Sequence, residues 1–187
     1  MMRKYASIKT QTITYNNYTI APIRDDDRYI IMDMRNAQIF HLRQKQKLTA
    51  AQQNHYFDIV ISPLFDAQQP SQILFSFLYN NECIGYGGLV HINWVDRHAE
   101  ISFIIKPELE EKYFTDCWQS FLYMIQQVAF DDIRLHKIFT YAFDLRPKLY
   151  PVVESCGFYK EAILKEHCFF EGRFIDVVIH SKINTTC

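Results

Sequence analysis

The clearest indication of the fold comes from residues 73–105, whose sequence is ILFSFLYNNECIGYGGLVHINWVDRHAEISFII. Apolar and β-branched residues dominate this run, and two polar pairs, Asn80-Asn81 and Asp96-Arg97, break it into three parts of strand length. Such short polar breaks join neighbouring strands that run in opposite directions. The run therefore predicts an antiparallel meander with strands at residues 73–79, 83–92 and 99–105.

The chain that follows the meander alternates between helix and strand patterns. Residues 113–130 carry apolar side chains at helical spacing, and residues 137–143 form a short apolar run typical of a buried strand. A short helix then leads to Cys156-Gly157-Phe158, and a Glu171-Gly172 turn joins two closing strands. A strand–helix–strand crossover after a meander predicts a mixed, mostly antiparallel sheet with helices on its faces.

The chain before the meander predicts a hairpin and two helices. The hairpin strands are residues 12–15 and 18–23, around the Asn16-Asn17 turn. Three aspartates at 25–27 precede apolar residues at helical spacing, and capping of a helix N-terminus explains them better than a metal site. Thr49 opens a capping box for a second helix. The predicted fold class is α/β (α+β), in a single domain over residues 1–187.

Composition narrows the class of protein. The 187 residues carry 20 basic and 21 acidic side chains, a formal charge of −1, and 49% hydrophobic residues, which disfavours disorder and bulk nucleic-acid binding. No apolar run approaches the ~20 residues that span a bilayer, and no signal-peptide pattern follows the start, so we expect a cytosolic protein. Five scattered cysteines and seven histidines without ligand spacing predict neither disulfides nor a metal.

Four segments in this order resemble the GNAT N-acetyltransferase family. They are ECIGYGGLVHINWVDRHAEISFII (82–105), LHKIFTYAFDLRP (135–147), VVESCGFYKEAILKEH (152–167) and GRFIDVVIHSKI (172–183). In that family an E-x-x-G-F element closes the short helix before the final hairpin, as residues 154–158 do here. Arg35-Asn36, Thr49 and His55-Tyr56-Phe57 look like the branch that acetylates amino groups of nucleotide-linked sugars or ribosomal-protein N-termini.

The resemblance implies that acetyl-CoA binds in a splayed opening between residues 99–105 and 137–143. Its pyrophosphate would lie at the start of the following helix, where unpartnered N–H groups and the helix dipole favour anions. The family's glycine-rich loop falls here on residues 109–115, which contain no glycine. The resemblance assigns cofactor contacts to Phe103, Ile104, Ile105, Lys112, Tyr113, Phe114, Thr115 and Arg146.

Direct acetyl transfer to an amine needs a proton acceptor and a donor for the leaving thiolate, but no enzyme nucleophile. Glu100 is the candidate base, because a carboxylate in an apolar cleft is suited to take a proton. The alternative is a surface carboxylate paired with Arg97 or Arg43. Val153 stands where the family commonly has an acidic tyrosine, so Tyr150, one turn away, is the candidate replacement, with a packing tyrosine as the alternative.

Acceptor contacts are predicted at Arg43, His91, Trp94 and His167. Arg43 would meet the pyrophosphate of a nucleotide sugar or lie in a solvated loop, and Trp94 would stack on a base or sugar or shield the meander. The first prediction is an acetyl-CoA-dependent N-acetyltransferase whose acceptor is a nucleotide-linked amino sugar. The alternatives are a protein N-terminal or lysine acetyltransferase and a catalytically silent GNAT-like binding module. A homodimer fits this pattern, and neither nucleic acid nor a membrane is expected as a partner.

Overall fold

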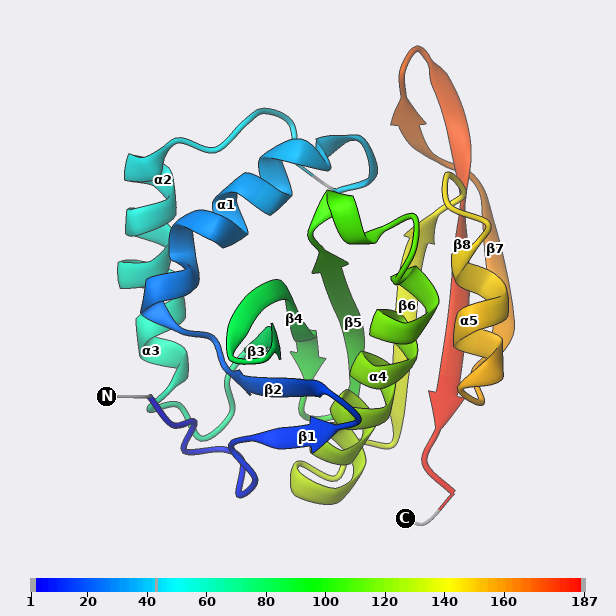
Figure 1. The fold of residues 1–187 in the computed structure, drawn as a ribbon. Coiled ribbons are helices and arrows are strands. Elements are labelled where there is room, and N and C mark those ends of the chain that lie inside the picture. The colour runs from blue at the N-terminus through cyan, green and yellow to red at the C-terminus, as the bar shows by residue number, and fades with distance from the viewer. Residues whose placement is uncertain (1–2, 43, 186–187) are drawn as a thin grey trace.

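The computed structural model describes residues 3–42 and 44–185, which contain one eight-stranded sheet (Figure 1). The strands are β1 (Ile13–Tyr15), β2 (Tyr18–Pro22), β3 (Ile73–Tyr79), β4 (Glu82–Asn93), β5 (His98–Ile105), β6 (Lys137–Phe143), β7 (Tyr159–Phe170) and β8 (Arg173–Ile183). Their order across the sheet is β1-β2-β3-β4-β5-β6-β8-β7. Only β5 and β6 run parallel, and the other neighbours are antiparallel. The predicted mixed, mostly antiparallel sheet is confirmed.

The predicted meander forms β3, β4 and β5, with β4 paired on both sides. Two glycines of β4 make this close pairing possible. A Cβ atom at Gly87 would lie 2.2 Å from the carbonyl oxygen of Ser102, and one at Gly88 would lie 2.0 Å from that of Ile73. Any side chain at these positions would force the backbones of neighbouring strands apart.

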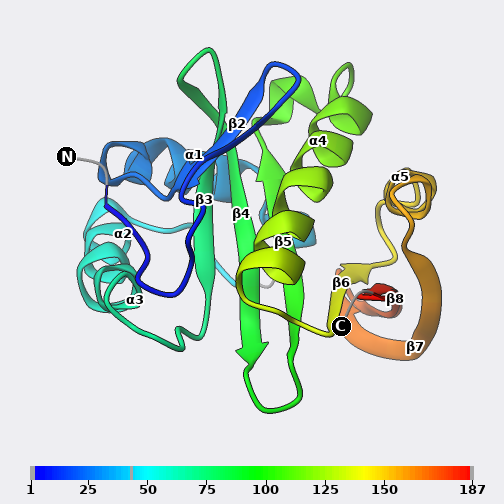
Figure 2. The same cartoon turned by 90° about the horizontal axis from the view of Figure 1, so that it is seen from below.

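Helices cover both faces of the sheet (Figures 1 and 2). One face carries α1 (Arg28–Ala37), α2 (Ala50–His55) and α3 (Ser62–Leu64), with the wider turns of Tyr56–Ile61 joining the last two. The other face carries α4 (Phe114–Gln127) and α5 (Leu149–Ser155). Side chains alternate between the two faces along each strand, so one strand can present residues to both sets of helices.

The long helix α4 fixes the position of β5. Trp118 and Phe121 are buried, and the Phe121 ring stacks on Phe103 of β5 with ring centroids 3.9 Å apart. Burying each of these large side chains contributes roughly 1.5–3 kcal/mol.

No helix in the described parts of the chain is both long and apolar enough to cross a membrane.

The two predicted helix starts have different outcomes. At α2 the capping box is confirmed, because the Thr49 hydroxyl accepts from the Gln52 N–H at 3.3 Å and the Gln52 side chain accepts from the Thr49 N–H at 2.9 Å. The capping interpretation of the aspartates is wrong for Asp27, which precedes α1 but makes no side-chain cap. Its buried carboxylate instead accepts from Arg24 at 2.6 and 2.8 Å and from the Ser76 hydroxyl at 2.6 Å. The ion pair and the hydroxyl engage both oxygens that a cap would use.

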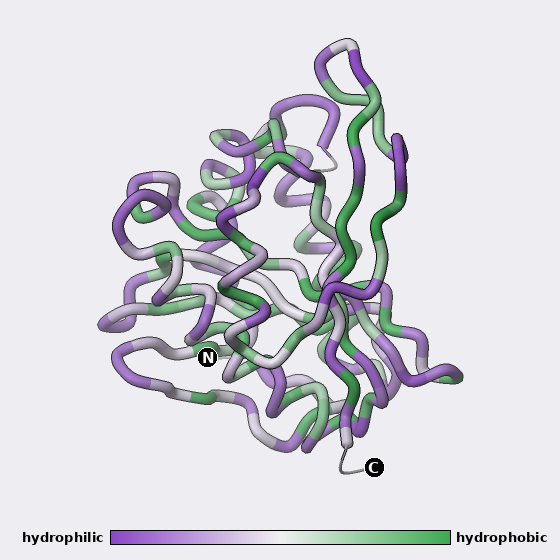
Figure 3. Tube along the Cα trace, turned by 90° about the vertical axis from the view of Figure 1, so that its right-hand side faces the viewer, coloured by the Kyte–Doolittle hydropathy of each residue, from purple (hydrophilic) through white to green (hydrophobic). Residues whose placement is uncertain are grey.

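Strands β7 and β8 form the predicted closing hairpin, which projects beyond the rest of the molecule (Figures 1 and 3). Hydrophobic and hydrophilic stretches alternate along it (Figure 3). Near its tip, Phe169 and Phe174 are exposed and pack on each other, with ring centroids 5.2 Å apart. At its base, β8 pairs with β6 along the whole of β6 and so holds one wall of the site described next.

Candidate active site

The parallel strands β5 and β6 separate part way along their length. Their pairing ends at Ile101 and Thr140. β4 continues to hold β5 as far as Ile105, and β8 continues to hold β6 as far as Phe143, so neither strand can move to close the gap. The result is the predicted V-shaped opening.

A cavity of about 440 Å³ occupies this opening, within the range of roughly 300–1,000 Å³ that small-molecule sites have. Its walls come from β4, β5 and β6, from α1 and the turn after it, and from α4 and α5. The lining residues are Arg35, His41, Leu42, Gln72, Val90, His91, Glu100, Ile101, Ser102, Phe103, Ile104, Trp118, Thr140, Tyr141, Ala142, Phe143, Arg146 and Leu149.

Two predicted residues meet where the pairing of β5 and β6 ends. Nδ1 of His91 lies 2.9 Å from Oε2 of Glu100, whose side chain is only 7% exposed, against 66% for His91. Glu100 is therefore a buried carboxylate and not a surface one. His91 reaches it because β4 bulges between Val90 and Asn93, where His91 adopts φ 51°. Bulges that redirect a side chain in this way are frequent beside active sites.

Two buried polar atoms on the cavity walls have no hydrogen-bond partner within the described residues. They are Nε1 of Trp118 and Oγ1 of Thr140. Buried polar groups are nearly always paired, so unpaired ones indicate a missing ligand, water or ion. Neither residue was predicted to contact a ligand. A threonine inside the apolar strand at 137–143 was the available signal for Thr140.

Arg146 spans the wide end of the opening. Its guanidinium donates to both carboxylate oxygens of Glu110, at 2.6 and 2.8 Å, and lies 3.2 Å from Nδ1 of His41. Glu110 also pairs with the Lys148 ammonium at 3.0 Å. Burial, with the nearby Arg146 charge, lowers the pKa of His41 to about 3, so its ring is neutral at physiological pH and can accept a hydrogen bond from Arg146.

The cofactor residues predicted on β5 lie at the opening. Phe103 and Ile104 line the cavity. Ile105 is buried outside the lining, and its carbonyl oxygen already accepts from Nε2 of Gln38 at 2.7 Å. The Ile104 carbonyl faces β4, so main-chain contacts to a ligand are available at Phe103 and not at the carbonyls of Ile104 or Ile105.

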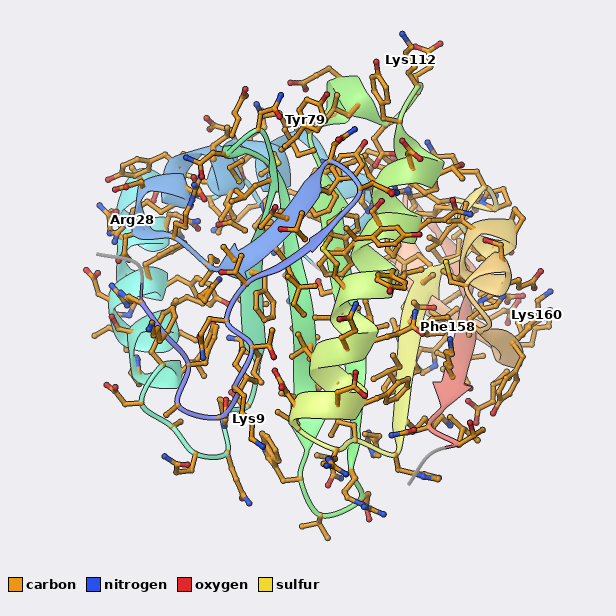
Figure 4. The ribbon with its side chains drawn as sticks, turned by 60° about the horizontal axis from the view of Figure 1, so that its bottom comes forward. Lys9, Arg28, Tyr79, Lys112, Phe158 and Lys160 are labelled. Carbon is orange, nitrogen blue, oxygen red and sulfur yellow. The ribbon has the colours of Figure 1, made fainter. Side chains whose placement is uncertain are left out.

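The cofactor residues predicted on the loop lie at the start of α4, outside the cavity lining. Phe114 opens the helix and is buried beneath Lys148, whose ammonium is 4.2 Å from the ring centroid. Lys112 extends outward (Figure 4), and its ammonium lies 5.3 Å from the Tyr113 ring centroid. Thr115 is exposed. The first N–H groups of α4 have no partner within the helix, so an anion can still bind there without glycine.

Tyr150, the predicted acid, is not among the residues that line the cavity. Its hydroxyl donates to Asp144 at 2.6 Å, and its ring stacks on His180 with centroids 5.2 Å apart. Tyr141, on β6, does line the cavity, and its hydroxyl lies 3.6 Å from the Cys168 sulfur. Tyr141 could not be predicted from the sequence, because the face of β6 that a residue occupies depends on the register of the sheet.

The remaining predicted acceptor contacts are dispersed. Nε1 of Trp94 donates to the Pro70 carbonyl at 2.9 Å, outside the cavity lining. His167 approaches the cavity through the Tyr141 ring, with centroids 6.0 Å apart. Arg43 lies outside the described residues. Of the three predicted contacts that the structure describes, only His91 lines the cavity.

The buried thiols are poor nucleophiles. Burial raises the pKa of Cys83 to about 12 and that of Cys117 to about 11, and it also raises the pKa of Cys156. The thiolate is the reactive form of cysteine, so these three thiols stay unreactive near neutral pH. Within residues 3–42 and 44–185, no group of three or more His, Cys, Asp or Glu side chains is arranged to hold a metal ion.

Comparison with known proteins points to one family. The family model described as "Acetyltransferase (GNAT) domain" matches residues 20–179. Over 94 residues the chain is 35% identical to the spermidine N(1)-acetyltransferase of Vibrio cholerae serotype O1, an alignment that covers 50% of this chain and 53% of that protein. The match thus spans about half the length of that relative.

Solved structures give the same fold. A crystal structure of spermidine N-acetyltransferase from Vibrio cholerae in complex with CoA and spermine has a TM-score of 0.78 at 23% identity, covering 89% of this chain and 95% of that one. A dodecameric structure of the Vibrio cholerae enzyme has a TM-score of 0.73 at 23% identity, covering 89% and 94%.

These matches agree with the predicted acyltransferase class and with acetyl-CoA as co-substrate. They do not support the predicted amino-sugar or ribosomal-protein branch, since the relatives found are spermidine acetyltransferases by name. The match to the family model covers most of the chain, and it agrees with the order of the strands and with the opening between β5 and β6. The chain belongs to the GNAT acetyltransferase family.

Proposed function

We propose that this protein is an acetyl-CoA-dependent N-acetyltransferase that moves an acetyl group directly onto a primary amine. The observation that carries the proposal is the opening between β5 and β6, with the buried Glu100 where their pairing ends. The opening gives room for an acyl thioester, and the carboxylate gives a partner for an amine. Both lie in a chain of a family defined by this reaction.

The residues of the opening fit an extended thioester. Past Ile101, the β5 edge that faces β6 has no strand partner in the described chain, so the backbone of Phe103, which faces this edge, can bind an amide of a pantetheine arm. The unpaired Nε1 of Trp118 and Oγ1 of Thr140 lie on the same cavity and would gain partners. Acetyl-CoA, when bound, supplies the activated acetyl group.

Glu100 and His91 attract the amine and remove its proton. A primary amine arrives largely as an ammonium ion, and the Glu100 carboxylate attracts it into a mostly buried position where charge interactions are strong. The amine must lose a proton before it can attack a carbonyl carbon. Glu100 accepts that proton, directly or through a water, and His91, which is 2.9 Å away and mostly exposed to solvent, relays the proton to solvent.

Tyr141 is better placed than Tyr150 to donate a proton to the leaving thiolate. It lines the cavity from β6, whereas the Tyr150 hydroxyl is engaged with Asp144. Burial and the neighbouring Asp144 carboxylate also raise the pKa of Tyr150, which makes that phenol a weaker acid. We therefore transfer the predicted role from Tyr150 to Tyr141.

The proposed acceptor is a polyamine of the spermidine type. Its support is the name of the relative matched over half of the chain, together with an anionic partner for one amino group at Glu100. The loop around Arg43, which was predicted to meet the pyrophosphate of a nucleotide sugar, gives less support to that acceptor. Lys45 and Lys47 are exposed and outside the cavity lining, and Arg43 lies outside the described residues.

The test offers acetyl-CoA with spermidine, a nucleotide-linked amino sugar or a peptide with a free N-terminus, and follows acetylated products by mass spectrometry. We expect acetylated spermidine, at a strongly reduced rate with Glu100→Gln and at the normal rate with the exposed control Glu171→Gln, in the turn of the closing hairpin. Acetylation of the sugar or the peptide alone would reject the polyamine acceptor. No product from any amine and no binding of acetyl-CoA would leave a GNAT-like binding module.

A further inference from the structure

A carboxylate occupies the cationic end of the opening. Glu110, in the loop before α4, accepts from the Arg146 guanidinium through both oxygens, and the Lys148 ammonium lies 3.0 Å from Oε2 and 3.1 Å from the Glu110 carbonyl oxygen. The Arg146 and Glu110 side chains are 12% and 19% exposed, and Lys148 is 49% exposed. The pair is therefore shielded from solvent, unlike an ordinary surface ion pair.

The geometry of this contact is the geometry by which arginine binds phosphate. A guanidinium offers two parallel N–H groups to two oxygens, and carboxylate and phosphate oxygens accept them in the same bidentate way. Lys148 adds a second cation above the Phe114 ring, at the start of α4, where unpartnered backbone N–H groups also favour an anion. Glu110 is thus surrounded by the groups that a phosphate requires.

The position of the cluster links it to the cofactor. Arg146 lines the cavity at its wide end, on the same side as the loop between β5 and α4. A thioester whose acyl end lies near Glu100 extends toward this end. This step rests on the proposed function, because it assumes that acetyl-CoA enters between β5 and β6.

We propose that Glu110 occupies, in the free protein, a phosphate subsite formed by Arg146 and Lys148, and that CoA binds by displacing the Glu110 carboxylate from these two cations. The carboxylate then acts as an internal competitor for the diphosphate portion of CoA. It lowers affinity for CoA without touching the pantetheine portion, and so sets how tightly the enzyme holds both acetyl-CoA and the CoA product.

The experiment measures binding of CoA and of pantetheine, which lacks the phosphates, by isothermal titration calorimetry at low ionic strength. Glu110→Gln removes the competing charge, and Glu111→Gln, an exposed neighbour, removes the same charge beside the subsite. For Glu110→Gln we expect CoA to bind about tenfold more tightly, which corresponds to ~1.4 kcal/mol, with pantetheine unchanged. For Glu111→Gln we expect little change with either ligand.

A second variant guards against misfolding of Glu110→Gln, which leaves Arg146 without its carboxylate. Lys148→Gln changes a half-exposed side chain, so its fold should persist, as circular dichroism would check. We expect it to weaken CoA binding severalfold and to leave pantetheine binding unchanged.

The outcomes separate the two proposals. If the wild-type protein binds CoA but Glu110→Gln binds it equally or more weakly, or if Glu111→Gln gives the same gain, the displacement proposal is overturned and the transferase proposal stands. If the wild-type protein binds CoA and Glu110→Gln alone binds it more tightly, the displacement proposal is supported. If neither the wild-type protein nor any variant binds CoA, both proposals fail.

Discussion

Replacing Glu100 by glutamine removes a negative charge from the cavity while keeping nearly the same shape. At an effective dielectric constant of about 20, an ammonium 4 Å from a carboxylate gains roughly 4 kcal/mol, and the 7% exposure of Glu100 makes this a suitable estimate. The neutral amide also cannot accept the proton of the amine. Loss of a general base typically costs 10²- to 10⁴-fold in rate, or about 3–5 kcal/mol, so we expect kcat to fall within that range.

The assay measures initial rates of acetyl transfer to spermidine over a range of pH, for wild type, Glu100→Gln and His91→Asn. His91 is 66% exposed, so solvent can take over part of its role, and we expect a loss of only about tenfold.

Two results would refute this reasoning. One is a Glu100→Gln variant that retains most of the wild-type kcat. The other is a larger loss in His91→Asn than in Glu100→Gln, which would make the imidazole the proton acceptor and leave Glu100 to orient it.

Three further predictions concern stability and binding. Gly87→Ala places a Cβ atom 2.2 Å from the Ser102 carbonyl oxygen, so urea unfolding should show a loss of about 1–3 kcal/mol. Burial lowers the pKa of His41 from 6.5 to about 3, so only the unfolded chain binds a proton between these values. Stability should therefore fall by roughly 1.4 kcal/mol per unit as pH drops through this window, and His41→Asn should flatten the slope in urea titrations. Thr140→Val removes an unpaired buried hydroxyl, so the melting temperature should hold or rise while calorimetry shows severalfold weaker acetyl-CoA binding.

The strands of the sheet could be predicted from the sequence because the residue patterns that indicate them are local. Strand length, apolar content and turn pairs predicted residues 99–105 and 137–143, and β5 and β6 match these bounds to within one residue. The capping box at Thr49 is likewise a pattern within four residues. Asp27 shows the limit of such signals, since its bond to Ser76 joins residues 49 positions apart.

The candidate site could be predicted from the sequence only in part. Glu100 was a candidate because it is the one carboxylate in an apolar strand. Its contact with His91 depends on a bulge in β4 that no local sequence pattern predicts. The contact between Glu110 and Arg146 joins residues 36 positions apart on two loops. Tyr150 does not line the cavity, because α5 places its ring against His180.

Residues that suggested a nucleotide-linked amino sugar as the acceptor have structural roles in this protein. Asn36, one of the residues that resembled the amino-sugar branch, binds the backbone of Leu48 through both side-chain atoms, at 2.9 and 2.7 Å. Thr49 caps α2, and the Tyr56 hydroxyl accepts from Gln72 at 3.2 Å. Residues that hold the chain together in this way can be shared by relatives with different acceptors, so they carry no information about the amine.

Calorimetric titration of the wild-type protein with acetyl-CoA, beside an Ala142→Trp variant, tests the central claim most directly. Ala142 lines the opening between β5 and β6, and an indole there would fill it. The account predicts one molecule bound per chain with micromolar affinity, and loss of this binding in a folded Ala142→Trp variant. Absence of binding to the wild-type protein at millimolar acetyl-CoA, or equal binding to the filled variant, would contradict it.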